Sequence, residues 1–111
     1  MNMGAVSSPV RVALAGVCLD LMTYKALAHL IMAVPGAVAV GNVDHYVGAE
    51  REVGRALENA LNRVCIVDFD QNAEEAIRIT ERLRAEYRDV YVFAASANAE
   101  PERIIAAMRA G

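Results

Sequence analysis

Hydrophobic residues occur along this chain in two kinds of pattern that alternate. Short continuous apolar runs, which indicate strands, cover residues 10–15, 37–43, 64–69 and 90–95, and the first run is typical of a strand buried on both faces of a sheet. After each of them the apolar residues recur at helical spacing. We therefore predict four strand-helix units, an arrangement typical of an α/β protein with a parallel sheet and helices on both of its faces.

The third predicted helix is the clearest in the sequence. It covers residues 73–87, with Asn72 as its N-cap and Glu75 as a capping-box partner. Two ion pairs four residues apart are expected on its outer face, Glu74 with Arg78 and Arg82 with Glu86. The second and fourth helices are predicted at residues 49–62 and 101–109, which completes the alternation.

The composition fits one folded domain and argues against several classes of protein. The chain has 111 residues, of which 56% are hydrophobic and 23% charged, so it is too apolar to be disordered. We predict a flexible leader at residues 1–9 and a domain at residues 10–111. The net charge of -3 offers no basic surface for nucleic acid. The longest apolar stretch, residues 26–41, contains His29 and is broken by Pro35, so we predict no membrane contact.

The cysteines and histidines indicate no catalytic or metal chemistry. Cys18 and Cys65 are predicted to be buried, reduced thiols, because the N-terminus lacks the charged and apolar regions of a secretory leader. His29 and His45 lie in different elements without the spacing of zinc ligands. We therefore expect a cytoplasmic protein.

Polar residues gather where the predicted strands end. Ligand sites of parallel sheets form beyond the carboxyl ends of the strands. Those positions hold Gly16 after the first strand, Asp68 and Asp70 at the third, and Ser96 after the fourth. The two carboxylates could bind a cation or could cap a loop amide or the next helix, and Ser96 could bind a ligand or form a turn.

These residues and the order of the elements resemble the receiver domain of response regulators in bacterial two-component signal transduction. Asp68 ends a strand, Ser96 stands in Ala94-Ala95-Ser96-Ala97, and Ala110-Gly111 matches the small pair before the family's fifth strand. The resemblance implies a CheY-like (flavodoxin-like) three-layer α/β/α fold, truncated here before the fifth strand and last helix. It also implies that Asp68 is the phosphoacceptor position and Ser96 the hydroxyl that senses the phosphoryl group.

Three departures from the family pattern argue against phosphorylation. The family's acidic pair, which holds Mg²⁺, is replaced by Gly16 and Val17. The family's lysine after the fifth strand has no counterpart, since the only lysine is Lys25, and residues 70–72 replace the usual Met-Pro step. Transfer of a phosphoryl group to a carboxylate depends on Mg²⁺ and a cation to neutralise the developing charge. We expect no cofactor, and Mg²⁺ only if Asp68 is phosphorylated.

Two functions follow from this comparison. The first is a degenerate, non-enzymatic pseudo-receiver for protein-protein interaction or localisation, with a protein partner or a fused ATPase or DNA-binding output domain. Residues 92–111 look like the N-terminal receiver-like domain of ParA/MinD-type ATPases of Flp/Tad pilus assembly, which favours the ATPase. The alternative is a phosphoacceptor in a phosphorelay, modified at Asp68, with Asp70 as an acidic neighbour. A third function, the binding of a nucleotide or flavin as in flavodoxin, is disfavoured because the chain lacks a phosphate-binding loop after the first strand.

The first predicted helix carries an apolar outer surface. It begins after the candidate N-cap Asp20 and ends at Pro35-Gly36. Its expected inward stripe is Leu27, Leu30, Ile31 and Val34, and its outer face has Met22, Ala26, Met32 and Ala33 beside Lys25 and His29. This outer face could contact a partner or a second copy in a homodimer, or it could be covered by the last helix of the receiver fold.

Overall fold

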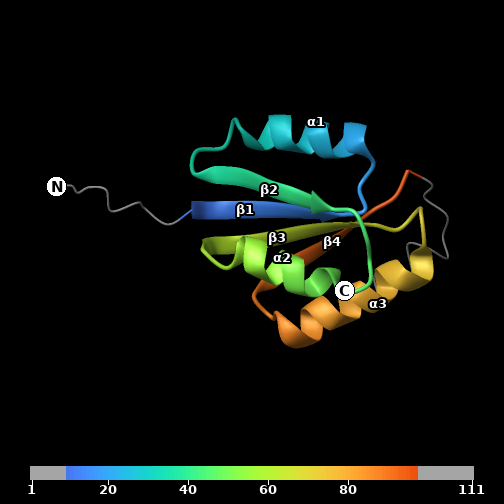
Figure 1. Ribbon diagram of the computed structural model, residues 1–111. Helices are drawn as coiled ribbons and strands as arrows, with labels where there is room; N and C mark the ends of the chain where they lie inside the picture. Colours follow the sequence, from blue (N-terminus) through green and yellow to red (C-terminus); the bar gives the residue numbers. More distant parts are fainter. Residues whose placement is uncertain (1–9, 98–111) are drawn as a thin grey trace.

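The computed structural model describes residues 10–97, which form a four-stranded sheet and three helices (Figure 1). The elements in chain order are β1 (Val10–Val17), α1 (Leu21–Ile31), β2 (Ala37–Val43), α2 (Ala49–Leu57), β3 (Ala60–Asp68), α3 (Ala73–Glu86) and β4 (Val90–Ala95). The strand order is β2-β1-β3-β4, and every neighbouring pair is parallel. The predicted α/β class and parallel sheet are confirmed. The leader at residues 1–9 and the helix at residues 101–109 lie outside the described residues.

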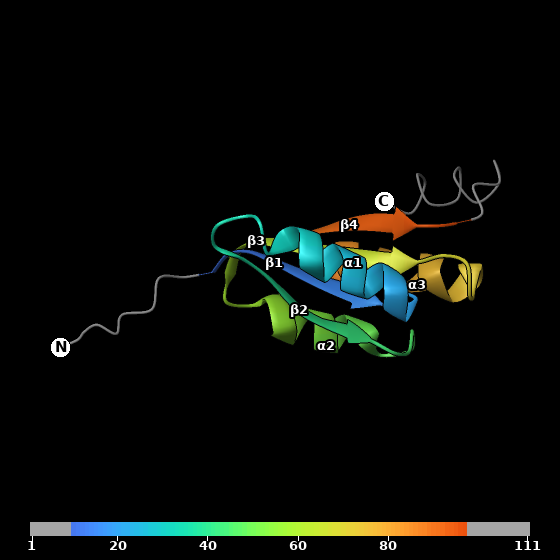
Figure 2. The same ribbon diagram turned by 90° about the horizontal axis from the view of Figure 1, so that it is seen from above.

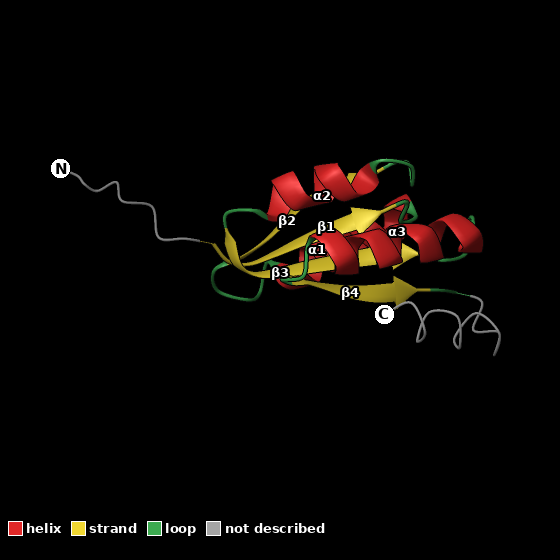
Figure 3. Cartoon of the chain, turned by 90° about the horizontal axis from the view of Figure 1, so that it is seen from below, coloured by secondary structure: helices red, strands yellow, loops and turns green. Residues whose placement is uncertain are grey.

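The helices are divided between the two faces of the sheet. α1 lies on one face, where it packs against β2 and leaves β4 uncovered (Figure 2). α2 and α3 lie together on the other face (Figures 1 and 3). The main core fills the space between the sheet and these two helices, where Val17, Val53, Val67 and Leu83 are completely buried. Burying each such side chain contributes about 1.5–3 kcal/mol.

The boundary between the second helix and the third strand differs from the prediction. The sequence predicted a helix to residue 62, but α2 ends at Leu57 and β3 begins at Ala60, which pairs with Val10 of β1. The Arg63 side chain closes the turn between them by donating to the carbonyls of Ala60 and Glu58, at 3.1 and 2.7 Å. Apolar residues at 57, 60 and 61 fit helical spacing, and pairing with β1 decides in favour of the strand.

The prediction of an inward stripe on α1 is wrong for Leu30 and Val34, which are 67% and 49% exposed. Leu27 and Ile31 are half-buried, and no residue of α1 is fully buried. The predicted N-cap is confirmed, because an Asp20 carboxylate oxygen accepts hydrogen bonds from the Thr23 amide and hydroxyl at 3.2 and 3.3 Å. No helix within residues 10–97 is long and apolar enough to span a membrane.

The predicted N-cap of α3 is confirmed, but its ion pairs are not those expected. The Asn72 side chain accepts from the Glu75 amide at 3.1 Å. Arg78 pairs with Glu75 rather than with Glu74. Arg82 points across to α2, where its guanidinium lies 3.5 Å from the Glu50 carboxylate, instead of pairing with Glu86. The Arg82–Glu50 pair depends on how α3 packs against α2, and the sequence of α3 alone cannot predict it.

Candidate functional site

Asp68, Asp70 and Ser96 come together at the carboxyl end of the sheet, as predicted. Asp68 is the last residue of β3 and pairs in register with Ala95, the last residue of β4. The three polar residues line a cavity of about 550 Å³, whose opposite wall is the start of α1 with Asp20 and Thr23. This is the crevice in which parallel α/β proteins bind ligands.

The Asp68 carboxylate caps the loop between β3 and α3. Asp68 is only 8% exposed, and its Oδ2 atom accepts hydrogen bonds from the amides of Gln71 and Asp70 at 2.9 and 3.2 Å. The Tyr46 hydroxyl donates to the Asp68 carbonyl at 2.7 Å and lies 3.5 Å from Oδ2. Burial raises the pKa of Tyr46 above its ordinary value of 10, so its hydroxyl stays a donor at neutral pH. The Asp68 carboxylate therefore has the role of a cap for loop amides, which is one of the roles predicted for it from the sequence.

Asp70 joins the β3-α3 loop to the chain that follows β4. Its Oδ1 atom accepts a hydrogen bond from the Ser96 hydroxyl at 2.7 Å, and its Oδ2 atom accepts one from the Ala97 amide at 2.7 Å. One carboxylate thus accepts hydrogen bonds from both a hydroxyl and an amide at this edge of the sheet. The sequence singled out Asp70 and Ser96 without indicating that they bind each other.

Gly16 and Val17 lie inside β1 rather than after it. Val17 is completely buried in the core, paired with Val67. A Cβ atom on Gly16 would lie 2.6 Å from Leu19 Cδ1 and 2.7 Å from Asn42 Oδ1. The Asn42 side chain is itself bound to the Leu19 amide and carbonyl, at 3.1 and 2.9 Å. Neither position offers an oxygen ligand from a side chain, and Gly16 has no room for one.

Within residues 10–97 this crevice shows no preassembled set of ligands for Mg²⁺. That ion requires near-octahedral oxygen ligands, usually with one or two carboxylates. Asp68 is bound to two loop amides, Asp70 to Ser96 and Ala97, and Asp20 caps α1. Across residues 10–97 there is no group of three or more His, Cys, Asp or Glu side chains arranged to hold a metal ion.

Three further residues shape this site and were not identified from the sequence as site residues. Cys18 follows β1 with a left-handed backbone (φ 56°), and its carbonyl accepts a hydrogen bond from the Gln71 side chain at 2.8 Å. Tyr46 holds the end of β3 from the loop after β2. A single Tyr or Gln in a loop has no local pattern that would reveal such a role. Only the sheet brings these segments, far apart in the sequence, side by side.

Both cysteines are buried, as predicted, and both histidines are exposed. Cys18 and Cys65 are both buried free thiols. Burial raises the pKa of Cys18, and it raises the pKa of Cys65 to about 12, so both thiols are protonated and unreactive at neutral pH. His29 is exposed on α1, while His45 lies 2.9 Å from Asp44 after β2.

Solved structures that are similar to this chain include the following three. A putative pilus assembly protein (cpaE) from Burkholderia thailandensis matches with a TM-score of 0.67 and 19% identity, over 91% of this chain and 80% of that one. A response regulator from Thermotoga maritima matches with a TM-score of 0.69 and 20% identity, over 92% and 79%. A response regulator receiver protein from Pseudomonas putida matches with a TM-score of 0.69 and 20% identity, over 96% and 83%. Protein-family models and curated proteins give no match to the sequence.

These similarities confirm the architecture that the resemblance implied. The chain has the CheY-like fold of response-regulator receiver domains, and the pilus assembly protein shares it. The identities of 19–20% establish the fold alone. The function of the crevice depends on its own residues.

Proposed function

Because the chain has the receiver fold, we propose that it is a non-enzymatic pseudo-receiver that acts by binding a protein partner. The observation that carries this proposal is the pair of hydrogen bonds from Ser96 and Ala97 to the Asp70 carboxylate. The Asp70 side chain thus accepts a hydrogen bond from Ser96, the hydroxyl that the resemblance assigns to sensing a phosphoryl group. The domain would therefore keep one conformation at this edge without phosphorylation.

The charge of the crevice supports the same proposal. The described residues that line it include the carboxylates of Asp20, Asp68 and Asp70 but no Lys or Arg. A phosphoryl group adds about -1.5 to -2 charges at neutral pH. Two unit charges about 4 Å apart near a protein surface repel by about 4 kcal/mol. Without a metal ion or a basic side chain, this repulsion opposes modification of Asp68.

The surface of the domain is suited to protein contact. Large apolar side chains are exposed on α1, at its C-cap and on β4: Leu21, Met22, Leu30, Met32, Tyr91 and Phe93. The likeness to a pilus assembly protein supports a role in assembly or localisation. The partner would be a separate protein, a second copy of the chain, or a fused output domain such as an ATPase or a DNA-binding domain.

A working phosphoacceptor is the second candidate. It is supported by the position of Asp68 at the end of β3, with Ser96 in the same cavity. It would require Asp70 to release Ser96, and Asp70 or Asp20, which line the same cavity, to act as the substitute carboxylate for Mg²⁺.

Treatment with a small phosphodonor separates the two candidates. The chain is incubated with Mg²⁺ and either acetyl phosphate or beryllofluoride, and its intact mass and amide NMR spectrum are recorded. We expect no change in either, and the same result for the matched variant Asp68→Asn. Stoichiometric, Mg²⁺-dependent phosphorylation that disappears in Asp68→Asn would refute the pseudo-receiver and establish the phosphorelay function.

A further inference from the structure

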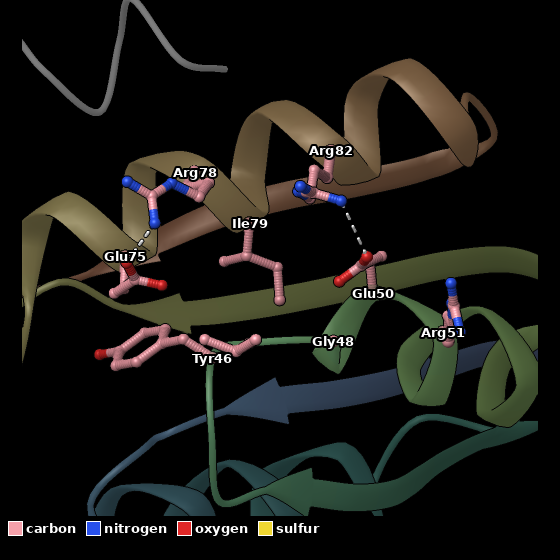
Figure 4. Close-up of a pocket in the computed structure, with 9 residues that line it drawn as sticks. Tyr46, Gly48, Glu50, Arg51, Glu75, Arg78, Ile79 and Arg82 are labelled. Carbon is pink, nitrogen blue, oxygen red and sulfur yellow. Dashed lines mark hydrogen bonds and ion pairs between the residues drawn. The ribbon is translucent and has the colours of Figure 1, made fainter.

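A second cavity lies between the start of α2 and residues 75–82 of α3 (Figure 4). Its volume is about 360 Å³. The residues that line it are Tyr46, Val47, Gly48, Glu50, Arg51, Glu75, Arg78, Ile79 and Arg82. None of them lines the crevice around Asp68, although Tyr46 also donates a hydrogen bond to the Asp68 carbonyl.

Glu50 is a buried carboxylate with one oxygen left without a partner. Its side chain is 6% exposed, and its Oε2 atom lies 3.5 Å from the Arg82 guanidinium. Its Oε1 atom is buried and has no hydrogen-bond donor among the described residues. Figure 4 shows the carboxylate between the two helices, with one oxygen toward Arg82 and the other toward the space in front of Ile79. Buried acceptors without a donor are rare and costly, so each calls for an explanation.

The rim of the cavity is basic, although the chain as a whole is acidic. Three arginines, Arg51, Arg78 and Arg82, and two carboxylates, Glu50 and Glu75, line the cavity, whereas the whole chain has a net charge of -3. One nitrogen of Arg78 pairs with Glu75 and one of Arg82 with Glu50, and Arg51 adds a further positive charge. Arg78 and Arg82 keep 60% and 57% of their side chains exposed. Guanidinium groups held at an opening in this way bind carboxylates with directed hydrogen bonds.

The wall and floor of the cavity add apolar surface. Val47 is 79% exposed at the rim, and Ile79 is almost completely buried behind it. A cation placed inside would be repelled by the nearby Arg82, and an anion would be repelled by Glu50. The unpaired oxygen is therefore suited to a neutral donor, and the rim to acidic groups on either side of that donor.

We propose that this cavity binds an acidic peptide segment of a protein partner. A hydroxyl or carboxamide side chain of the segment donates to Glu50 Oε1, and flanking Asp or Glu side chains pair with Arg51 and Arg78. The inference rests on the proposed function, since it supplies the chemistry of the partner that a pseudo-receiver would bind.

The test is a selection of random, phage-displayed heptapeptides on the immobilised 111-residue chain. We expect enrichment of Ser, Thr, Asn or Gln flanked by Asp or Glu. A synthetic enriched peptide should shift amide NMR signals of residues 46–51 and 75–82. Glu50→Leu should weaken its binding about tenfold, the effect of one lost hydrogen bond to a buried acceptor.

Matched variants separate a specific site from general attraction of acidic peptides. Arg78→Gln should weaken binding severalfold, while Arg88→Gln, which removes an exposed arginine outside this cavity, should leave it unchanged. Circular dichroism of each variant checks that it folds. No enrichment, enrichment of basic peptides, or equal binding by Glu50→Leu would overturn the proposal.

The outcome is independent of the phosphodonor experiment. Phosphorylation of Asp68 together with peptide binding at Glu50 would refute the pseudo-receiver and leave this site standing. Absence of phosphorylation together with a failed selection would refute the site and leave the pseudo-receiver standing.

Discussion

Replacing Asp68 with Ala tests whether this carboxylate serves the fold or is kept for chemistry. The substitution removes the acceptor of two amide hydrogen bonds, from Gln71 at 2.9 Å and from Asp70 at 3.2 Å. Hydrogen bonds to a charged group contribute about 1.5–3 kcal/mol each when they are buried. Gln71 is exposed and Asp70 partly so, which allows water to replace part of the loss. We expect the free energy of unfolding to fall by about 2 kcal/mol.

Two matched variants make this measurement specific. Asp68→Asn keeps one side-chain oxygen that can accept a hydrogen bond, so its cost should be about 1 kcal/mol. Asp89→Ala removes an exposed carboxylate from the turn before β4 and should change stability by less than about 0.5 kcal/mol.

Urea unfolding followed by far-UV circular dichroism measures all three variants. For a domain of this size, Asp68→Ala should also lower the melting temperature by about 10 °C. If Asp68→Ala were as stable as the unsubstituted chain, or more stable, the capping role would be refuted. The carboxylate would then be retained at a cost to stability, as functional groups often are, and the phosphoacceptor function would gain support.

Two other predictions concern the neighbourhood of the crevice. Gly16→Asp introduces an acid at a position that the resemblance aligns with the family's acidic pair. It should destabilise the domain by about 1–3 kcal/mol, measured by urea unfolding, because its Cβ would collide with Leu19 and the Asn42 side chain. Calorimetry that showed Mg²⁺ binding by this variant would contradict our account of the site. The hydrogen bond to Asp44 raises the pKa of His45 above its ordinary value of 6.5. The stabilisation from the protonated ring is therefore present below about pH 6.5, and it is lost as the pH rises through the raised pKa of the folded state. An NMR titration of the imidazole should show this pKa, which should fall in Asp44→Asn, and equal values in both chains would refute the pairing.

Local patterns in the sequence determined the class of the fold and most of its elements. Continuous apolar runs predicted the four strands, although β4 leaves Tyr91 and Phe93 exposed, so an apolar residue at every position did not mean burial on both faces. Asp20 and Asn72 predicted the starts of two helices, since each cap is a contact between residues three apart. Asp68, Asp70 and Ser96 could be placed at one edge because the carboxyl ends of parallel strands meet there.

The tertiary structure decided which residues bind each other. Pairing with β1 made Ala60 the start of a strand, although its spacing suited a helix. The packing of α2 against α3 turned Arg82 toward Glu50 and left the second carboxylate oxygen of Glu50 buried without a donor among the described residues. The loop after β3 brought Asp70 to Ser96. These contacts join residues 26 or more positions apart, and their geometry depends on register and packing, which local hydrophobic patterns do not record.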